Sequence, residues 1–545
     1  MRIRLIVALS VLVARPAGVA QAQTVAFTRL ETIGNDTDDR TRLAQLFGQR
    51  TTGAYLLRSA SSMTPGLMGE PRRVRWALFA PELMTVGNSS ITFSLNDGAL
   101  WAGRGWSLAL RTGVRVEVGR LSVTLAPELL GSENIPYDLA PPEVTLARPS
   151  GRSLYSSPWH IRPFSIDLPQ RFGDPPLRAV DLGQSTLAVD AGPVTVGLSS
   201  ENEWWGPGIR NAIVLSNNAA GIPRLFLRTS RPLATPLGTV AARWFAGGLT
   251  ESRFFDRDPA NDLRSIAGVG IAWTPRWEPD LTVGFARAVY APVSGWGRVP
   301  LRLFDVLRDF GRPTNAPPGD SLQIPGRDQV YSLFARWVFP ADGFAVHAEW
   351  ARTEFPASLR DLLTHPNHTQ GYTLGLEWAR PVRRQRDAVR VQAEVTYLEM
   401  SPSYRNRPVS TFYTSRRAVQ GYTQRGQVIG AAIGPGASSQ WLAVDYVAPR
   451  WRVGLFGGRV RWEDDALYFF PNTAISLNKW CSHDVSLLGG VSLGGETRWG
   501  RVHMTLTRSE RLNTFFYHLT QCGLVDPQLV RDVPNTTLQL RFSPP

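Results

Sequence analysis

The sequence predicts an all-β transmembrane barrel preceded by a small, partly helical region, and three observations lead to this prediction. Polar and apolar residues alternate with a period of two from Gly105 onward, aromatic residues recur at the ends of the alternating runs, and no run of eighteen apolar residues occurs. A strand that crosses a lipid bilayer needs one apolar face and can carry polar residues on the other. A transmembrane helix would need about 20 consecutive apolar residues, so we expect none.

The first 22 residues have the order of a cleavable secretory signal. Arg2 and Arg4 precede a short apolar core at 5–14, and AQA at 20–22 places small residues at the two positions that a signal peptidase recognises. We therefore expect residues 1–22 to be removed and the mature chain to reach the outer membrane of a Gram-negative-type bacterium. A buried N-terminal helix is the alternative.

Residues 23–103 have a different pattern from the rest of the chain. Asp38 and Asp39 precede RTRLAQLFGQR at 40–50, in which Leu43, Leu46 and Phe47 recur at helical spacing. We expect a helical periplasmic region over 23–103 and an outer-membrane β-barrel over 104–545.

The alternating runs are longer than the strands of soluble β proteins, which usually have about five or six residues. The clearest run sets apolar residues against polar ones on the two faces of a strand: Tyr331, Leu333, Ala335, Trp337 and Phe339 against Ser332 and Arg336. An apolar face ending in Trp or Tyr matches the aromatic girdles of membrane barrels, although a soluble all-β protein is an alternative. The length after Gly105 accommodates about 16 to 20 strands. The segment TLQLRF at 537–542 would be the closing strand.

The composition limits the possible partners. Of the 59 basic residues only Lys479 is a lysine, and the formal net charge is +14. This charge favours anionic partners such as acidic polysaccharide or lipid headgroups, whereas the export signal argues against nucleic acid. Cys481 and Cys522 flank a predicted hairpin, so a disulfide between them is compatible with the sequence; whether it forms depends on a Cα separation that spacing leaves open.

Motifs that suggest chemistry have ordinary explanations in their context. GVSLG at 490–494 matches the serine-hydrolase elbow, but that elbow needs a strand–turn–helix setting and these residues lie in a predicted hairpin. His365 and His368 have the spacing of metal ligands, but the Pro and Asn between them indicate a surface loop. No G-K-[ST] run exists for a phosphate-binding loop. We therefore expect no enzyme activity, no metal and no cofactor.

The stretch SENEWWGPGIRNAIVLSNNAAGIPRL at 200–225 combines aromatic residues, a backbone break and amides. If Trp204 and Trp205 alternate in a strand, one faces lipid or the membrane interface and the other faces inward. The GPG at 206–208 ends any ladder, because proline lacks an N–H and glycine permits unusual dihedrals. Two interpretations stay open: a sugar site, or a lumen plug packed against the barrel wall. The sugar site would consist of Glu201, Glu203, Trp204, Trp205, Arg210, Asn217 and Asn218.

These residues also carry a resemblance to a known family. WWGPG at Trp204, Trp205, Gly206, Pro207 and Gly208, followed by LSNNA at Leu215, Ser216, Asn217, Asn218 and Ala219, resembles the Wzi-type capsule assembly family of outer-membrane proteins. The run GYTQRGQVIGAAIGPGASSQWLAVDY at 421–446 is similar to a second segment of that family. The resemblance implies a barrel of about eighteen strands with a helical region on the periplasmic side. It also implies a lectin-like, non-enzymatic role in holding capsular polysaccharide at the cell surface.

Arginines in predicted loops are further candidates for contact with an acidic polymer. Arg405 and Arg407 lie near Tyr404, and Arg416 and Arg417 lie near Tyr413. A planar guanidinium pairs with carboxylates and stays protonated, so acidic capsular polysaccharide or exopolysaccharide is the expected partner of a monomeric protein. Solvated loop charges and lipopolysaccharide contacts are the alternatives for these residues. A porin or an exopolysaccharide export channel is the alternative function.

Overall fold

The computed structural model describes residues 27–34, 36–49, 53–68, 74–140, 151–160, 164–308, 310, 326–382, 387–405, 410–466, 483–516 and 531–545. The expected signal peptide, Cys481, Cys522 and Arg407 lie outside these residues. Among the described helices, none is both long and apolar enough to cross a membrane.

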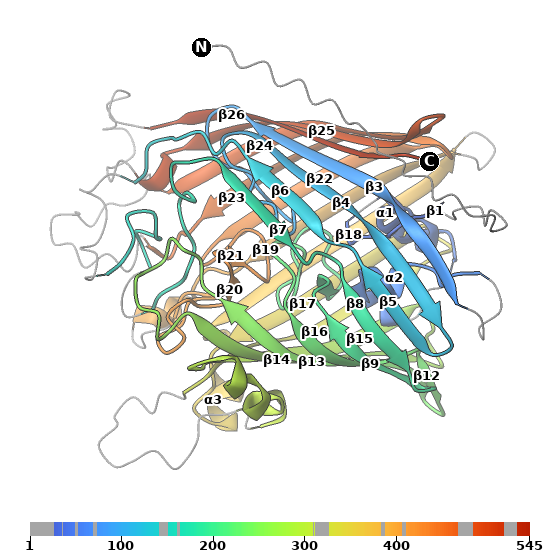
Figure 1. The fold of residues 1–545 in the computed structure, drawn as a ribbon, viewed down its shortest axis with the longest axis horizontal. Helices are drawn as coiled ribbons and strands as arrows, with labels where there is room; N and C mark the ends of the chain where they lie inside the picture. The colour runs from blue at the N-terminus through green and yellow to red at the C-terminus, as the bar shows by residue number, and fades with distance from the viewer. Residues whose placement is uncertain are drawn as a thin grey trace, which may run out of the picture.

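Within the described residues, eighteen antiparallel strands close into a barrel, which confirms the predicted fold (Figure 1). The first six are β3 (Arg75–Asn88), β4 (Gly105–Val118), β5 with β6 (Leu121–Leu125, Glu128–Ser132), β7 with β8 (Leu177–Asp181, Thr186–Asp190), β9 (Val194–Ser199) and β11 (Arg224–Thr229), which β12 (Leu233–Thr235) extends. The next seven are β13 (Gly238–Thr250), β14 (Leu263–Pro275), β15 (Leu281–Pro292), β16 (Asp328–Phe339), β17 (Phe344–Thr353), β18 (Gln370–Val382) and β19 (Asp387–Tyr397). The last five are β22 (Ser438–Val447), β23 (Trp451–Trp462), β24 (Asp484–Thr497), β25 (Gly500–Leu512) and β26 (Val533–Ser543). The ring closes where β26 pairs with β3, as expected for the C-terminal segment.

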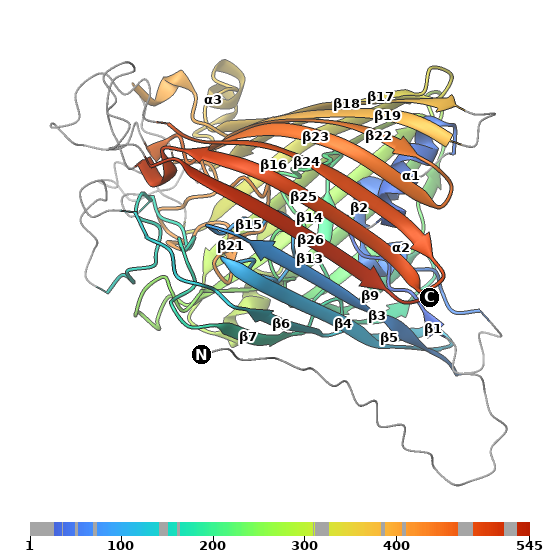
Figure 2. The same ribbon diagram turned by 90° about the horizontal axis from the view of Figure 1, so that it is seen from above.

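The two ends of the barrel differ in the length of their connections. Tight turns such as 340–343 and 448–450 join strands at the end that also holds the C-terminus, which we call the turn end (Figure 2). Long connections such as 89–104 and 398–437 leave the opposite end, the loop end, where α3 (Leu359–Thr364) also lies. In outer-membrane barrels the turns are periplasmic and the long loops extracellular.

The faces of the strands follow the predicted alternation. On β16, Leu333 is 54% and Trp337 40% exposed, whereas Arg336 is 4% exposed. On β18, Leu374 is exposed and Thr373 is buried. The apolar side chains therefore form the outer surface of the barrel, and the polar side chains face the lumen.

The N-terminal segment belongs to the barrel, so the expected boundary at residue 103 is wrong. β3 pairs on one side with β26 and on the other with β4, and β1 (Phe27–Thr28) runs parallel to β3. The register of β3 shifts between Phe79 and Glu82, around Pro81, which disturbs the alternation that would have marked a strand.

The expected helix exists, but it lies inside the barrel at the turn end (Figure 1). Leu43 and Leu46 of α1 (Asp36–Leu46) pack against lumen-facing alanines of β17, β18 and β19. Arg42 forms an ion pair of 2.7 Å with Glu377 on β18. The short elements that follow are η1 (Gly53–Leu56), β2 (Leu57–Ser59) and α2 (Ala60–Met63).

Two connections fold back into the barrel and carry its main hydrophobic core. The first insert, residues 200–223, contains β10 (Glu203–Trp205), and the second insert, residues 398–437, contains η5 (Pro402–Arg405), β20 (Thr423–Gln424) and β21 (Gln427–Val428). Their apolar residues form one cluster with the lumen wall. The remaining short helices are η3 (Trp296–Arg302), η4 (Asp305–Leu307) and η6 (Thr514–Phe516).

Candidate functional site

The WWGPG segment begins with a short strand inside the lumen. β10 pairs antiparallel with β2, and these two strands form a sheet of their own, separate from the barrel. Trp204 is 3% and Trp205 0% exposed. The expectation that one ring faces lipid is therefore wrong, because a strand surrounded by a barrel has both of its faces buried.

The two carboxylates beside these rings hold the first insert in place. Glu203 accepts hydrogen bonds from the indole of Trp205 and, at 2.9 Å, from the guanidinium of Arg224. Glu201 accepts bonds from the backbone N–H and the hydroxyl of Ser61 at 2.7 and 2.9 Å. Both carboxylates are buried, as are the rings, so the plug interpretation describes all four side chains and none of them offers an open surface to a polymer.

The backbone break at 206–208 fits only glycine at its outer positions. Gly206 has φ +115°, and a Cβ there would lie 2.9 Å from a carboxylate oxygen of Glu349. A Cβ on Gly208 would overlap the carbonyl oxygen of Asn211. The carbonyl of Pro207 accepts a 3.1 Å bond from Arg42. The motif therefore forms a tight turn that docks onto α1 and the barrel wall.

A lumen-facing glutamate fixes the residues after this turn. The carboxylate of Glu394, on β19, accepts hydrogen bonds from the backbone N–H groups of Ile209, Arg210 and Asn211, the latter two at 2.9 Å. These contacts orient the chain so that the side chain of Arg210 enters a cavity in the lumen.

The LSNNA segment joins the first insert to its neighbours. The side-chain amide of Asn218 donates a 2.9 Å bond to the carbonyl of Val428 in the second insert. The amide of Asn217 donates at 3.2 Å to the carbonyl of Asn96 in the 89–104 connection. Both side-chain amides thus donate hydrogen bonds to backbone carbonyls inside the barrel. The sequence had left a sugar-binding role open for them.

Two tyrosines of the second insert were missed as members of this assembly. The hydroxyls of Tyr413 and Tyr422 donate to the carbonyls of Ile213 and Val214 at 2.7 and 2.8 Å, and their rings are stacked with centroids 5.6 Å apart. The family-like segments meet beside these contacts, where the N–H of Ser216 donates to the carbonyl of Ile429 and the amide of Asn218 to that of Val428, both at 2.9 Å.

The structure describes the side chains of two of the four arginines predicted to contact an acidic polymer. Arg416 and Arg417 are exposed on the second insert, where the hydroxyl of Ser415 accepts the N–H of Arg417 at 3.3 Å. The side chain of Arg405 lies outside the described residues, as does Arg407. A role of these four residues in binding stays a prediction.

Aromatic residues that the sequence analysis did not select line a cavity at the loop end, which we call the loop-end cavity. Its volume is about 160 Å³. Its aromatic lining comprises Phe93, Trp101 and Trp462, which are half-buried, and Tyr137, Trp159 and Phe515, which are buried. Charged groups join these rings: Glu463, and Arg511, which binds Asp484 through two 2.7 Å hydrogen bonds. Half-buried Trp462 donates a 2.8 Å bond from its indole to Ser486.

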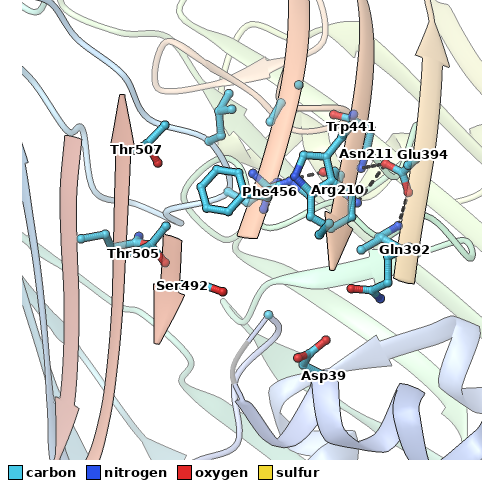
Figure 3. A pocket seen from close by; sticks show the side chains of 18 of the residues that line it. Asp39, Arg210, Asn211, Gln392, Glu394, Trp441, Phe456, Ser492, Thr505 and Thr507 are labelled. Carbon is cyan, nitrogen blue, oxygen red and sulfur yellow. Dashed lines mark hydrogen bonds between the residues drawn. The ribbon is translucent and has the colours of Figure 1, made fainter. Parts of the chain in front are cut away.

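A larger cavity lies deeper, between the first insert and the wall formed by β19, β22–β26 and β3 (Figure 3). This lumen cavity has a volume of about 290 Å³ and is lined by six arginines and five carboxylates. Most of these charges are paired. Asp39 of α1, for example, binds Arg390 at 2.7 Å, and the arginines around this carboxyl hold its pKa below its usual range against the effect of burial, which is the largest influence and raises it.

These features define an outer-membrane β-barrel whose lumen is occupied by its own inserts. No family model and no curated protein sequence matches the chain. Among solved structures, the fold is similar to that of Wzi, described as an outer-membrane protein involved in group 1 capsule assembly in Escherichia coli and as a carbohydrate-binding β-barrel. The two align with 12% identity and a TM-score of 0.52 over 85% of this chain and 84% of that one.

Two other solved structures also align. Acinetobacter baumannii OccAB2 matches 85% of this chain and 97% of its own at 9% identity and a TM-score of 0.40. Pseudomonas aeruginosa OccK5 matches 87% of this chain and 98% of its own at 8% identity and a TM-score of 0.39. The eighteen-stranded barrel that the family resemblance implied is confirmed by the strand pairing and by the similarity to Wzi, and an identity of 12% establishes the fold alone.

Proposed function

We propose that this protein is a non-catalytic outer-membrane protein that binds capsular or other acidic surface polysaccharide and anchors it at the cell surface. The loop-end cavity is the observation that carries the proposal. It combines several aromatic rings with charged and amide side chains at the end of the barrel where long connections face outward.

This combination suits a sugar chemically. The half-buried rings of Phe93, Trp101 and Trp462 can pack against the C–H groups of pyranose rings. Planar side chains such as those of Gln170 and Arg511 can bind hydroxyl and carboxylate groups. Exposed Arg416 and Arg417 on the second insert supply further positive charge, which favours an acidic polymer.

The filled lumen favours binding over transport. A porin or export channel needs an open path, whereas here the two inserts pack together with the lumen wall in one hydrophobic cluster. The Wzi barrel, described as carbohydrate-binding, has the same fold, which supports the proposal without establishing it.

Retention of polysaccharide on cells tests the function. Cells that lack the protein would be complemented with the parent or with the double variant Trp101→Leu/Trp462→Leu, and the ratio of cell-bound to released acidic polysaccharide measured. Both indoles are half-buried and line the loop-end cavity. We expect the parent to restore retention and the double variant to lose most of it.

Trp499→Leu is the matched control, because this exposed indole lies in a tight turn at the opposite end of the barrel. It should retain polysaccharide like the parent. Equal retention by the parent and the double variant, with equal amounts of folded barrel in the membrane, would contradict the proposal.

A further inference from the structure

The side chain of Arg210 stands out among the charged groups of the lumen. It follows the WWGPG turn, is held by Glu394 through its backbone N–H, and extends into the lumen cavity, where it is exposed (Figure 3). Its guanidinium lies over the ring of Trp441 on β22, 5.5 Å from the centroid. An arginine in this position can donate hydrogen bonds from its planar guanidinium to a ligand in the cavity.

Within the described part of the chain, no hydrogen bond or ion pair engages the guanidinium of Arg210. The two carboxylates that attract it already accept other hydrogen bonds: Glu394 accepts three backbone N–H groups, and Asp97 accepts bonds from Gln539 at 2.7 Å and Ser94 at 3.1 Å. Although Arg210 is exposed to the cavity, the surrounding barrel limits hydration of its guanidinium and lowers its pKa, and the attraction of these two carboxylates only partly opposes that effect. The guanidinium of Arg210 therefore keeps its hydrogen-bond donors available in the cavity.

The wall facing Arg210 carries hydroxyl groups. Ser492 on β24 and Thr505 and Thr507 on β25 line the cavity together with the ring of Phe456 on β23 (Figure 3). Hydroxyl groups both donate and accept hydrogen bonds, so this wall suits a ligand that is itself rich in hydroxyls. The volume of about 290 Å³ is near the lower end for ligand pockets and fits a small molecule.

The cavity adjoins spaces at both ends of the barrel. It shares Arg452, His503 and Arg541 with a smaller cavity of about 80 Å³ at the turn end. It shares Phe93 and Ile433 with the loop-end cavity. The residues shared with the turn-end cavity are polar, whereas those shared with the loop-end cavity are apolar. A polar ligand would therefore enter from the turn end.

We propose that the lumen cavity binds a small polyhydroxylated carboxylate, such as a free uronic acid. The guanidinium of Arg210 pairs with the carboxylate through its planar fork, Trp441 fixes the guanidinium by stacking, and the Ser492–Thr505–Thr507 wall binds ligand hydroxyls. This site is distinct from the loop-end cavity and goes beyond the proposed function, so it does not depend on whether polymer binds there.

Calorimetric titration of the full-length protein in detergent micelles tests the site, with glucuronate, glucose and acetate as probes. We expect saturable binding of glucuronate, and weaker binding of glucose and of acetate because each lacks half of the recognised groups. Arg210→Gln should weaken glucuronate binding at least about tenfold, and Thr505→Val should weaken it a few-fold while leaving the insert untouched. Arg360→Gln, on the exposed helix α3, should bind like the parent.

Three results would overturn the proposal. The first is absence of glucuronate binding to the parent. The second is equal glucuronate affinity of the parent and of both site variants. The third is binding of acetate or glucose as tightly as glucuronate. Equal affinity for acetate would mean that the hydroxyl wall does not contribute to binding, and equal affinity for glucose would mean that the charge does not. Because the probe is a monosaccharide and the variants lie in the lumen, failure here is distinguishable from failure of polymer retention.

Discussion

The hydroxyl of Tyr413 donates a 2.7 Å hydrogen bond to the carbonyl of Ile213, and the same oxygen accepts the backbone N–H of Ala431 at 2.8 Å. One fully buried side chain thereby joins the two inserts that fill the lumen. Since neither insert contains a long regular element, such cross-links and the surrounding apolar cluster determine how firmly the lumen is closed.

Removing this hydroxyl should loosen the closure. Tyr413→Phe leaves a buried carbonyl and a buried N–H without their partner, at a cost of about 1–3 kcal/mol. We expect the parent to show no large steady conductance in planar bilayers and the variant to show intermittent openings. Tyr372→Phe, whose ring lies on β18 and stacks against Tyr397, is the control. If the Tyr413→Phe variant shows no openings, the inserts are held mainly by apolar packing.

The glycines of the GPG turn should resist substitution for a steric reason. At Gly208 a Cβ would overlap the carbonyl oxygen of Asn211, which is backbone and cannot move aside without displacing the turn. Gly208→Ala should therefore increase protease cleavage of the first insert in the folded barrel. Gly297→Ala, where a Cβ meets open space, should leave cleavage unchanged. Equal protease resistance of the two variants would contradict this account of the motif.

The outer and inner faces of the barrel should respond differently to charge. Leu374→Arg places a cation on the lipid-facing surface and should cost about 2–4 kcal/mol near the bilayer midplane, impairing assembly. Thr505→Arg, which extends into the lumen cavity, should assemble normally. Thr373→Arg should not, because the inserts pack against that position and leave it fully buried. Heat-modifiable migration of the barrel on gels measures assembly, and equal behaviour of Leu374→Arg and Thr505→Arg would refute the face assignment.

The connection at 251–262 should loosen as the pH rises. Burial, aided by the nearby acid Asp256, raises the pKa of Glu251 from 4.5 to about 8 although Gln420 hydrogen-bonds to it. The folded state thus retains a proton that the unfolded state releases, and stability falls as the pH increases from about 4.5 to about 8. Hydrogen exchange at 251–262, corrected for intrinsic rates, should be faster at pH 8 than at pH 5. Glu251→Gln should remove this dependence, whereas Glu278→Gln at the turn end should keep it.

The sequence predicted those parts of the fold that a bilayer imposes locally. On β16, lipid outside and polar lumen inside produce the alternation of Leu333 and Trp337 with Arg336. β3 was missed because Pro81 and a register shift interrupt the same pattern.

The interior of the barrel could be predicted less well. Trp204 and Trp205 alternate like wall residues, yet the surrounding barrel buries both. The setting of Arg210 depends on Trp441 and on hydroxyls of β24 and β25, which only barrel closure brings near it. The aromatic residues of the loop-end cavity likewise come from several connections and from the end of β23, and no local spacing marks them as one group.

Direct binding of an acidic surface polysaccharide to the purified barrel tests the central claim. Fluorescently labelled polymer would be titrated with the parent, with Trp101→Leu/Trp462→Leu and with Trp499→Leu in detergent. The account predicts saturable binding to the parent and to Trp499→Leu, and affinity about tenfold or more weaker for the double variant, since two stacking surfaces are lost. Absence of binding to the parent, or equal affinity for the parent and the double variant, would contradict it.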